Sequence, residues 1–99
     1  MKYYREKYKF GNATAIEAWN DDGPYAPVSV NIKGISETLP ENQIVLNHNL
    51  YKMRELPNVQ EIFNDLVKEV VRLVRCGFVE TAIVELNDNW KEICYENIH

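Results

Sequence analysis

The chain lacks any apolar run long enough to cross a membrane. No stretch of its 99 residues approaches the ~18 consecutive apolar residues of a transmembrane helix. The first ten residues, MKYYREKYKF, are charged and have no apolar core of the kind found in secretory signals. We therefore expect a cytoplasmic protein with no membrane partner. We also expect a single domain, residues 1–99, because two domains of half this length would each bury too little apolar surface.

Residues that bind metals or act as nucleophiles are scarce. The two cysteines, Cys76 and Cys94, and the two histidines, His48 and His99, have neither C-x-x-C nor H-x-x-x-H spacing. In a reducing compartment such a pair of cysteines is expected to stay as free thiols. The only two serines lie outside any strand-turn-helix elbow. The sequence therefore predicts no metal, no cofactor and no catalytic residue.

Glycine-rich phosphate loops and a broad basic surface are missing too. The four glycines are scattered, and the only one beside the predicted helix lies at its C-terminal end. The formal net charge is −4, with acids concentrated in residues 17–41 and in the last twenty residues. Acidic segments repel phosphate backbones, so nucleic acid is disfavoured as a partner. The basic residues of segment 2–9 are expected on a solvated strand face, although they leave contact with an acidic surface open.

The segment NDDGPYAPVSVNI, residues 20–32, predicts a hairpin. Asp22-Gly23 lies between two β-like runs, and glycine tolerates the positive φ that a tight turn requires. Pro24 and Pro27 lack amide hydrogens, which places them at the strand entrance or in a bulge. In VSVNI (28–32) the alternation predicts a strand with Val28, Val30 and Ile32 on one face. The acids of NDDG lack the further ligands of a calcium loop, so we expect them only to form and hydrate the turn.

The segment from Val59 to Val74 predicts one long amphipathic helix. Apolar residues at 59, 62, 63, 66, 67, 70, 71, 73 and 74 cover about half of a helical circumference. Asn58 with Glu61 matches a capping pattern, and Gly77 is placed to end the helix in a left-handed conformation. So broad an apolar stripe is typical of a helix lying flat on a sheet.

The remaining segments indicate strands. YREKYKF (4–10) followed by a Gly11-Asn12 turn, ATAIEAW (13–19), QIVLNHN (43–49) and FVETAIVEL (78–86) read as strands, and 33–42 reads as a loop. The tail after the Asn87–Asn89 turn fits either a helix or a strand, and we favour a short strand. The expected fold is α+β, a small antiparallel sheet of about 4–6 strands in the order β-β-β-α-β. The long helix packs on one sheet face and leaves the other open.

The residues that carry a recognisable order of motifs are Gly23, Tyr25, Ala26, Val30, Asn31, Leu39, Pro40, Glu41, Asn42, Asn47, Asn49, Gly77 and Phe78. This order resembles a family of small uncharacterised proteins carried by plasmids, phages and integrative conjugative elements of Gram-positive bacteria. The resemblance covers about residues 10–86 and leaves 87–99 as a C-terminal extension. It departs from the family at Asn47-His48, where the family tends to have an acidic residue. The resemblance implies a mobile-element accessory protein and no particular mechanism.

The candidate functional residues are therefore binding residues. Aromatic side chains on an open sheet face are typical anchors for a protein partner, although they could equally cover a sheet edge or complete a small second core. We expect a non-enzymatic protein that binds an unidentified host or element-encoded protein through an open sheet face or strand edge, with homodimerisation by edge pairing as a related case. The alternatives are a ligand-binding or enzyme-like module centred on His48, and an acidic inhibitor of a host nucleic-acid-binding protein. The candidate interaction residues are Trp19, Tyr25, Asn47, His48, Asn49 and Trp90.

Overall fold

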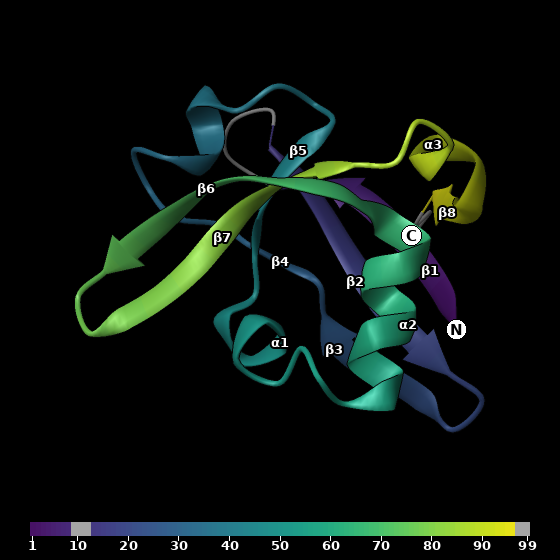
Figure 1. The fold of residues 1–99 in the computed structure, drawn as a ribbon. Helices are drawn as coiled ribbons and strands as arrows, with labels where there is room; N and C mark the ends of the chain where they lie inside the picture. Colours follow the sequence, from purple (N-terminus) through teal and green to yellow (C-terminus); the bar gives the residue numbers. More distant parts are fainter. Residues whose placement is uncertain (9–12, 97–99) are drawn as a thin grey trace.

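The computed structural model describes residues 1–8 and 13–96, which form an α+β fold of two four-stranded sheets (Figure 1). The expected α+β class is confirmed, and the expected single sheet is wrong. The expected turn at Gly11-Asn12 lies outside the described residues, as do the last three residues, including His99. The elements in chain order are β1 (Lys2–Lys7), β2 (Thr14–Asn20), β3 (Gly23–Pro27), β4 (Ser29–Val30), η1 (Ser36–Thr38), β5 (Gln43–Leu46), α1 (His48–Lys52), α2 (Pro57–Leu66), β6 (Val67–Cys76), β7 (Val79–Leu86), α3 (Trp90–Ile93) and β8 (Cys94–Glu96).

The first sheet has the strand order β3-β2-β1-β8. β2 and β3 form the hairpin expected from Asp22-Gly23, with φ of +126° at Gly23. Pro24 lies near the start of the edge strand β3, beside a bulge in which Tyr25 has no partner in β2, as its missing amide hydrogen requires. β8 pairs in parallel with β1 at the opposite edge. The tail is therefore a short helix followed by a short strand, and the favoured strand is confirmed for residues 94–96.

The second sheet has the strand order β4-β5-β7-β6 and is antiparallel throughout. β6 and β7 form a long hairpin that extends away from the rest of the molecule (Figure 1). Cys76 lies opposite Val79, so Gly77 and Phe78 form a two-residue loop. Gly77 has φ of +63° and Phe78 has a negative φ, the combination of a type II′ turn, which suits the twist of a hairpin.

The main core lies between the two sheets and is closed by the helices. The first sheet contributes residues such as Tyr3 and Ile16, the second sheet Ile44 and Val84. Three residues of α2 enter this core on one helical face, at the i, i+3 and i+7 spacing of an amphipathic helix. These residues are Val59, Ile62 and Leu66, all fully buried.

A smaller cluster lies on the other face of the second sheet. Val45, Ile83 and Val74 are buried there, and residues of the segment between β4 and β5 pack over them. Val28 enters the main core while Val30 and Ile32 pack on this smaller cluster, so the expected shared face of these three residues is wrong. Both faces of the second sheet are therefore covered over at least part of their area.

The expected helix from Val59 to Val74 is wrong in its second half. The helix α2 ends at Leu66, and residues 67–76 form the strand β6. Four of these ten residues are valine, whose branched Cβ favours extended backbone. Gly77 accordingly turns a hairpin and ends no helix. The Asn58 cap is also wrong, since Leu56 is the N-cap residue and Pro57 begins the helix.

Two irregularities in β6 explain why the apolar residues of this strand have a spacing typical of a helix. The pairing with β7 skips Lys68 and Val71, so that Val67, Val70 and Leu73 lie opposite Leu86, Val84 and Ala82. Each skipped residue lengthens the strand's repeat from two residues to three. Apolar side chains at 67, 70 and 73 therefore share one face of a strand at a spacing that otherwise indicates a helix.

Candidate functional site

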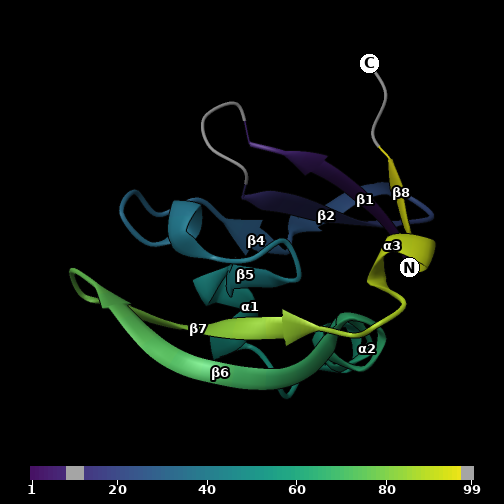
Figure 2. The same cartoon turned by 90° about the horizontal axis from the view of Figure 1, so that it is seen from above.

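The candidate site lies on the outer face of the first sheet. Successive residues of a strand point to opposite faces, and in β1 the buried Tyr3 points to the core, so Tyr4 points away from it. Glu17 in β2 and Tyr95 in β8 lie directly opposite Tyr4 in register and share its face. In Figure 2 no helix or strand formed by residues 1–8 and 13–96 lies over this side of β1 and β2. The first sheet therefore has the open face that the sequence predicts for a single sheet.

Three aromatic rings form a row across this face. The Trp19 and Tyr4 ring centroids are 5.6 Å apart in an edge-to-face arrangement of 70°, and those of Tyr4 and Tyr95 are 5.9 Å apart and tilted by 43°. Tyr95 is 57% exposed, whereas Trp19 and Tyr4 are half-buried. Aromatic pairs of this geometry stabilise each other by about 0.5–1.5 kcal/mol beyond burial. The row is therefore ordered before any partner arrives, which lowers the entropic cost of binding.

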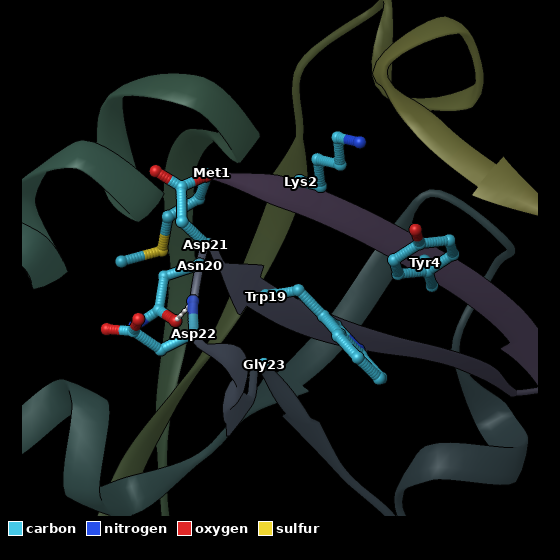
Figure 3. Close-up of a pocket in the computed structure, with 8 residues that line it drawn as sticks. All are labelled: Met1, Lys2, Tyr4, Trp19, Asn20, Asp21, Asp22 and Gly23. Carbon is cyan, nitrogen blue, oxygen red and sulfur yellow. Dashed lines mark hydrogen bonds between the residues drawn. The ribbon is translucent and has the colours of Figure 1, made fainter.

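A shallow hollow of about 540 Å³ adjoins the Trp19 end of the row (Figure 3). It is lined by residues 1, 2 and 4 of β1 and its approach and by residues 19–23 of the hairpin. Figure 3 shows the Trp19 ring pointing away from the carboxylates of Asp21 and Asp22, which lie on the Met1 side. The Asp22 amide donates a 2.9 Å hydrogen bond to Asn20 Oδ1, and Asn20, Asp21 and Asp22 are exposed. These acids therefore belong to the turn, and the aromatic rings form the separate feature.

A second hollow, of about 160 Å³, lies on the other side of Tyr4. Its lining includes Glu6, Tyr8, Glu17 and Pro27. The Tyr8 hydroxyl is 2.9 Å from Ser29 Oγ, and burial raises the pKa of Tyr8 above its ordinary value despite that hydrogen bond. Glu17 and Glu6 therefore place carboxylates beside the Tyr4 ring. Among the residues of β1 and β2 that lie on this face, Lys2 is the only cation.

Asn47 is a structural residue. Its Oδ1 accepts a 3.0 Å hydrogen bond from the Asn49 amide, and its Nδ2 donates a 2.8 Å bond to the Pro27 carbonyl oxygen. The side chain is buried and caps α1, so the strand expected over 43–49 ends at Leu46. His48 and Asn49 are exposed on the first turn of α1. The three neighbouring residues therefore do not converge on one site.

His48 lines a wide hollow of about 510 Å³ between α1 and the tip of the β6–β7 hairpin. The lining also includes Lys52, Arg54 and Glu80, and Glu80 lies 3.6 Å from Arg75. Within the described part of the chain, no residue hydrogen-bonds the His48 imidazole. A general base requires a group that orients it, so this hollow gives His48 no catalytic arrangement.

The other two candidates are less accessible. Trp90 is 5% exposed and belongs to the main core, with the Arg5 guanidinium 5.9 Å from its ring centroid, so it is not available to a partner of the folded chain. Tyr25 is half-buried and packs against the same core. Of the six candidates, Trp19 is the one that joins the aromatic row.

The cysteines are free thiols in different environments. Cys76 is exposed beside the hairpin turn, and Cys94 is buried in β8. Burial raises the pKa of Cys94 to about 11, which the nearby Arg5 opposes, so its thiolate is scarce at neutral pH. Among residues 1–8 and 13–96, no three or more His, Cys, Asp or Glu side chains gather in a group that fits a metal ion.

Tyr95 and Glu17 are site residues that sequence reasoning did not single out. Glu17 alternates with Trp19 along β2, a signal that places both on one face once the strand is identified. Tyr95 joins them only because β8 pairs with β1, and this pairing across about 90 residues has no local sequence signal.

Comparisons with protein families, with curated proteins and with solved structures find no match for this chain. In the part of the chain that the structure describes, no helix has both the length and the apolar character needed to span a membrane.

Proposed function

We propose that this protein is a non-enzymatic binding protein that engages another protein through the outer face of its first sheet. The observation that carries the proposal is the row of Trp19, Tyr4 and Tyr95 on a face that no element in the described part of the chain covers. Aromatic side chains contribute disproportionately to protein interfaces, because they bury a large area with few rotatable bonds. A partner that covers the row would extend the contact into the hollows on either side of Tyr4.

The charges around the row favour a basic segment of the partner. Glu17 lies directly opposite Tyr4, and Glu6 lines the same hollow. An arginine or lysine that approaches the Tyr4 ring gains a cation–π contact of about 0.5–2 kcal/mol and an ion pair with Glu17. The net charge of −4 attracts such a segment from a distance. This balance also disfavours nucleic acid, since the face offers carboxylates where phosphates need cations.

The biological setting of the proposal comes from the resemblance to the mobile-element family. On that basis the partner is a host or element-encoded protein, met in the cytoplasm. The alternative of a His48-centred enzyme has less support, since His48 lies on a different surface and lacks an orienting group. An acidic mimic of nucleic acid also has less support, because aromatic rings rather than carboxylates form the row on this face.

The experiment is a quantitative capture from host lysate with matched variants. Tyr95→Ala removes a ring from the proposed face and Glu17→Lys reverses a charge on it, both at exposed positions where the cost to folding is small. Phe78→Ser is the control, because it removes a fully exposed aromatic ring from the distant hairpin tip. A protein that is retained by wild type and by Phe78→Ser but lost with both face variants supports the proposal. A bound set that is the same for all four proteins contradicts it.

A further inference from the structure

The smaller hollow beside Tyr4 arises from the way β3 ends. Glu17 lies opposite Tyr4 in β1 and opposite Pro27 in β3, so these three residues form a line across the first sheet. β3 ends at Pro27, and the next outward residue of β2, Ala15, pairs with Glu6 of β1 and has no partner in β3. The side chain of Ala15 is a single methyl group, and the hollow of about 160 Å³ lies beside it.

Tyr8 forms a second aromatic wall of this hollow. Its hydroxyl lies 2.9 Å from Ser29 Oγ, and its amide donates a 3.0 Å hydrogen bond to the Ala13 carbonyl oxygen. Ser29 Oγ also accepts a 3.0 Å bond from the Ile16 amide. These bonds fix the Tyr8 ring and satisfy the polar atoms around it. The hollow therefore has two tyrosine rings in its lining, those of Tyr4 and Tyr8.

The charged groups that line the hollow are carboxylates. Glu6 and Glu17 contribute them, and no lysine or arginine of the described residues joins the lining. Glu17 is exposed and forms no ion pair within residues 1–8 and 13–96. Directly opposed residues of neighbouring strands have Cβ atoms about 4.5–5.5 Å apart, so a cation on the Tyr4 ring also reaches the Glu17 carboxylate. The hollow therefore favours a positively charged group.

The size and lining of the hollow favour one long side chain. Its volume of about 160 Å³ is below the roughly 300–1,000 Å³ of small-molecule sites. Arginine has an apolar stem and a flat, weakly hydrated guanidinium that stacks on aromatic rings and donates two parallel hydrogen bonds to a carboxylate. Ala15 and Pro27 offer apolar surface to the stem, and Tyr4 with Glu17 offers a ring and a carboxylate to the guanidinium. A lysine ammonium is compact and strongly hydrated, so it gains less from the same surroundings.

We propose that this hollow binds an arginine side chain of the partner protein, with the guanidinium between the Tyr4 ring and the Glu17 carboxylate. The proposal rests on the proposed function, which places the partner on this face, and it adds the residue that the partner inserts. Trp19 and Tyr95 do not line this hollow. Binding of arginine is therefore separable by experiment from contact with the rest of the aromatic row.

Titration followed by nuclear magnetic resonance tests the proposal without the partner. The probes are three blocked peptides, acetyl-Gly-Ser-X-Ser-Gly-amide, with arginine, lysine or citrulline at X. Citrulline has nearly the shape of arginine and no charge. The arginine peptide should shift the backbone amides of residues 4, 6, 15 and 17 in a saturable manner at millimolar concentration. The lysine peptide should bind several-fold more weakly, and the citrulline peptide should leave these amides unshifted.

Four variants place the bound arginine. Ala15→Leu fills the hollow, and Glu17→Gln removes the charge. Each should weaken binding of the arginine peptide roughly tenfold, the effect of one lost charge-assisted hydrogen bond in the case of Glu17→Gln. Ala15→Ser keeps the hollow open, and Asp22→Asn removes one charge from the hairpin turn outside this hollow. These two matched controls should bind like wild type, and circular dichroism with thermal scans checks that all four variants fold.

Several results overturn the proposal. These are an arginine peptide that causes no saturable shift at these amides, equal shifts with the citrulline peptide, and a folded Ala15→Leu protein that binds like wild type. A lysine peptide that binds as tightly as the arginine peptide overturns the choice of arginine. Tyr95→Ala should keep its affinity for the arginine peptide while it loses the captured partner. A failed capture therefore leaves a positive titration standing, and a failed titration leaves the aromatic row as the proposed contact.

Discussion

Replacing Asn47 tests whether this residue holds the fold together or belongs to a ligand site. Asn47 Oδ1 caps α1 through the Asn49 amide, and Nδ2 binds the Pro27 carbonyl oxygen that precedes β4. Asn47→Ala removes both bonds. Loss of the cap costs about 1 kcal/mol, and loss of the part-buried bond to Pro27 costs about another 1 kcal/mol. We expect a total loss of about 2 kcal/mol in the free energy of unfolding, or roughly 10 °C in Tm for a chain of this length.

Urea unfolding followed by circular dichroism, with thermal scans in parallel, measures this loss. Asn47→Asp keeps the acceptor for the Asn49 amide and loses the donor to Pro27, so about half of the effect should remain. His48→Ala and Asn49→Ala are the controls, because both side chains are exposed and the Asn49 amide is unchanged by the substitution. They should stay within about 0.5 kcal/mol of wild type. An Asn47→Ala protein as stable as wild type would falsify this reasoning, as would a His48→Ala protein equally destabilised.

Three further outcomes are expected. Ser29→Ala should cost about 2 kcal/mol in urea unfolding, because Ser29 Oγ accepts a 3.0 Å bond from the Ile16 amide and also contacts the Tyr8 hydroxyl; an unchanged midpoint contradicts this. In the native protein Ellman's reagent should titrate Cys76 rapidly and reach Cys94 only after unfolding, since Cys94 is buried and its pKa is raised to about 11; two equally fast thiols contradict this. Burial, with the 2.5 Å bond that Tyr3 donates to Asp65, raises the pKa of Tyr3 above its ordinary 10.0, so its stabilising contribution is complete below pH 10.0 and is lost as pH rises beyond it. Tyr3→Phe should therefore flatten the alkaline branch of the stability profile, and an unchanged alkaline slope contradicts the assignment.

Local signals in the sequence predict much of the fold. The Asp22-Gly23 hairpin, the strands near 14–20 and 79–86 and the helical turn after Pro57 all follow from turn chemistry and side-chain alternation. These features depend on residues within one or two turns of each other. The α+β class follows from them.

The division into two sheets could not be read from the sequence. It depends on β6, whose skipped residues Lys68 and Val71 give a strand a three-residue repeat, and the same repeat is typical of a helix. Strand propensity from the four valines competes with that periodicity, and pairing with β7 decides the outcome. The segment from Val59 to Val74 contains no helix-ending residue at Leu66, so its sequence alone predicts a helix that continues beyond that point.

The candidate site was predictable only in part. Trp19 lies on the open face as its position beside the hairpin suggests, whereas Trp90 has the same aromatic character and lies in the core. The difference arises because α3 turns Trp90 inward before β8 pairs with β1, and both events depend on contacts distant in sequence. Asn47 stands out in sequence for its polarity, but the structure uses that polarity to satisfy backbone groups.

The most direct test of the account is hydroxyl-radical footprinting of the chain alone and with the protein that it captures. Oxidation of Tyr95, Tyr4 and Trp19 is expected to fall when the partner is bound, because these rings form the proposed contact. Oxidation of Phe78, which is fully exposed at the distant hairpin tip, should stay the same. Protection of Phe78 with an unchanged aromatic row would contradict the claim that the outer face of the first sheet binds the partner.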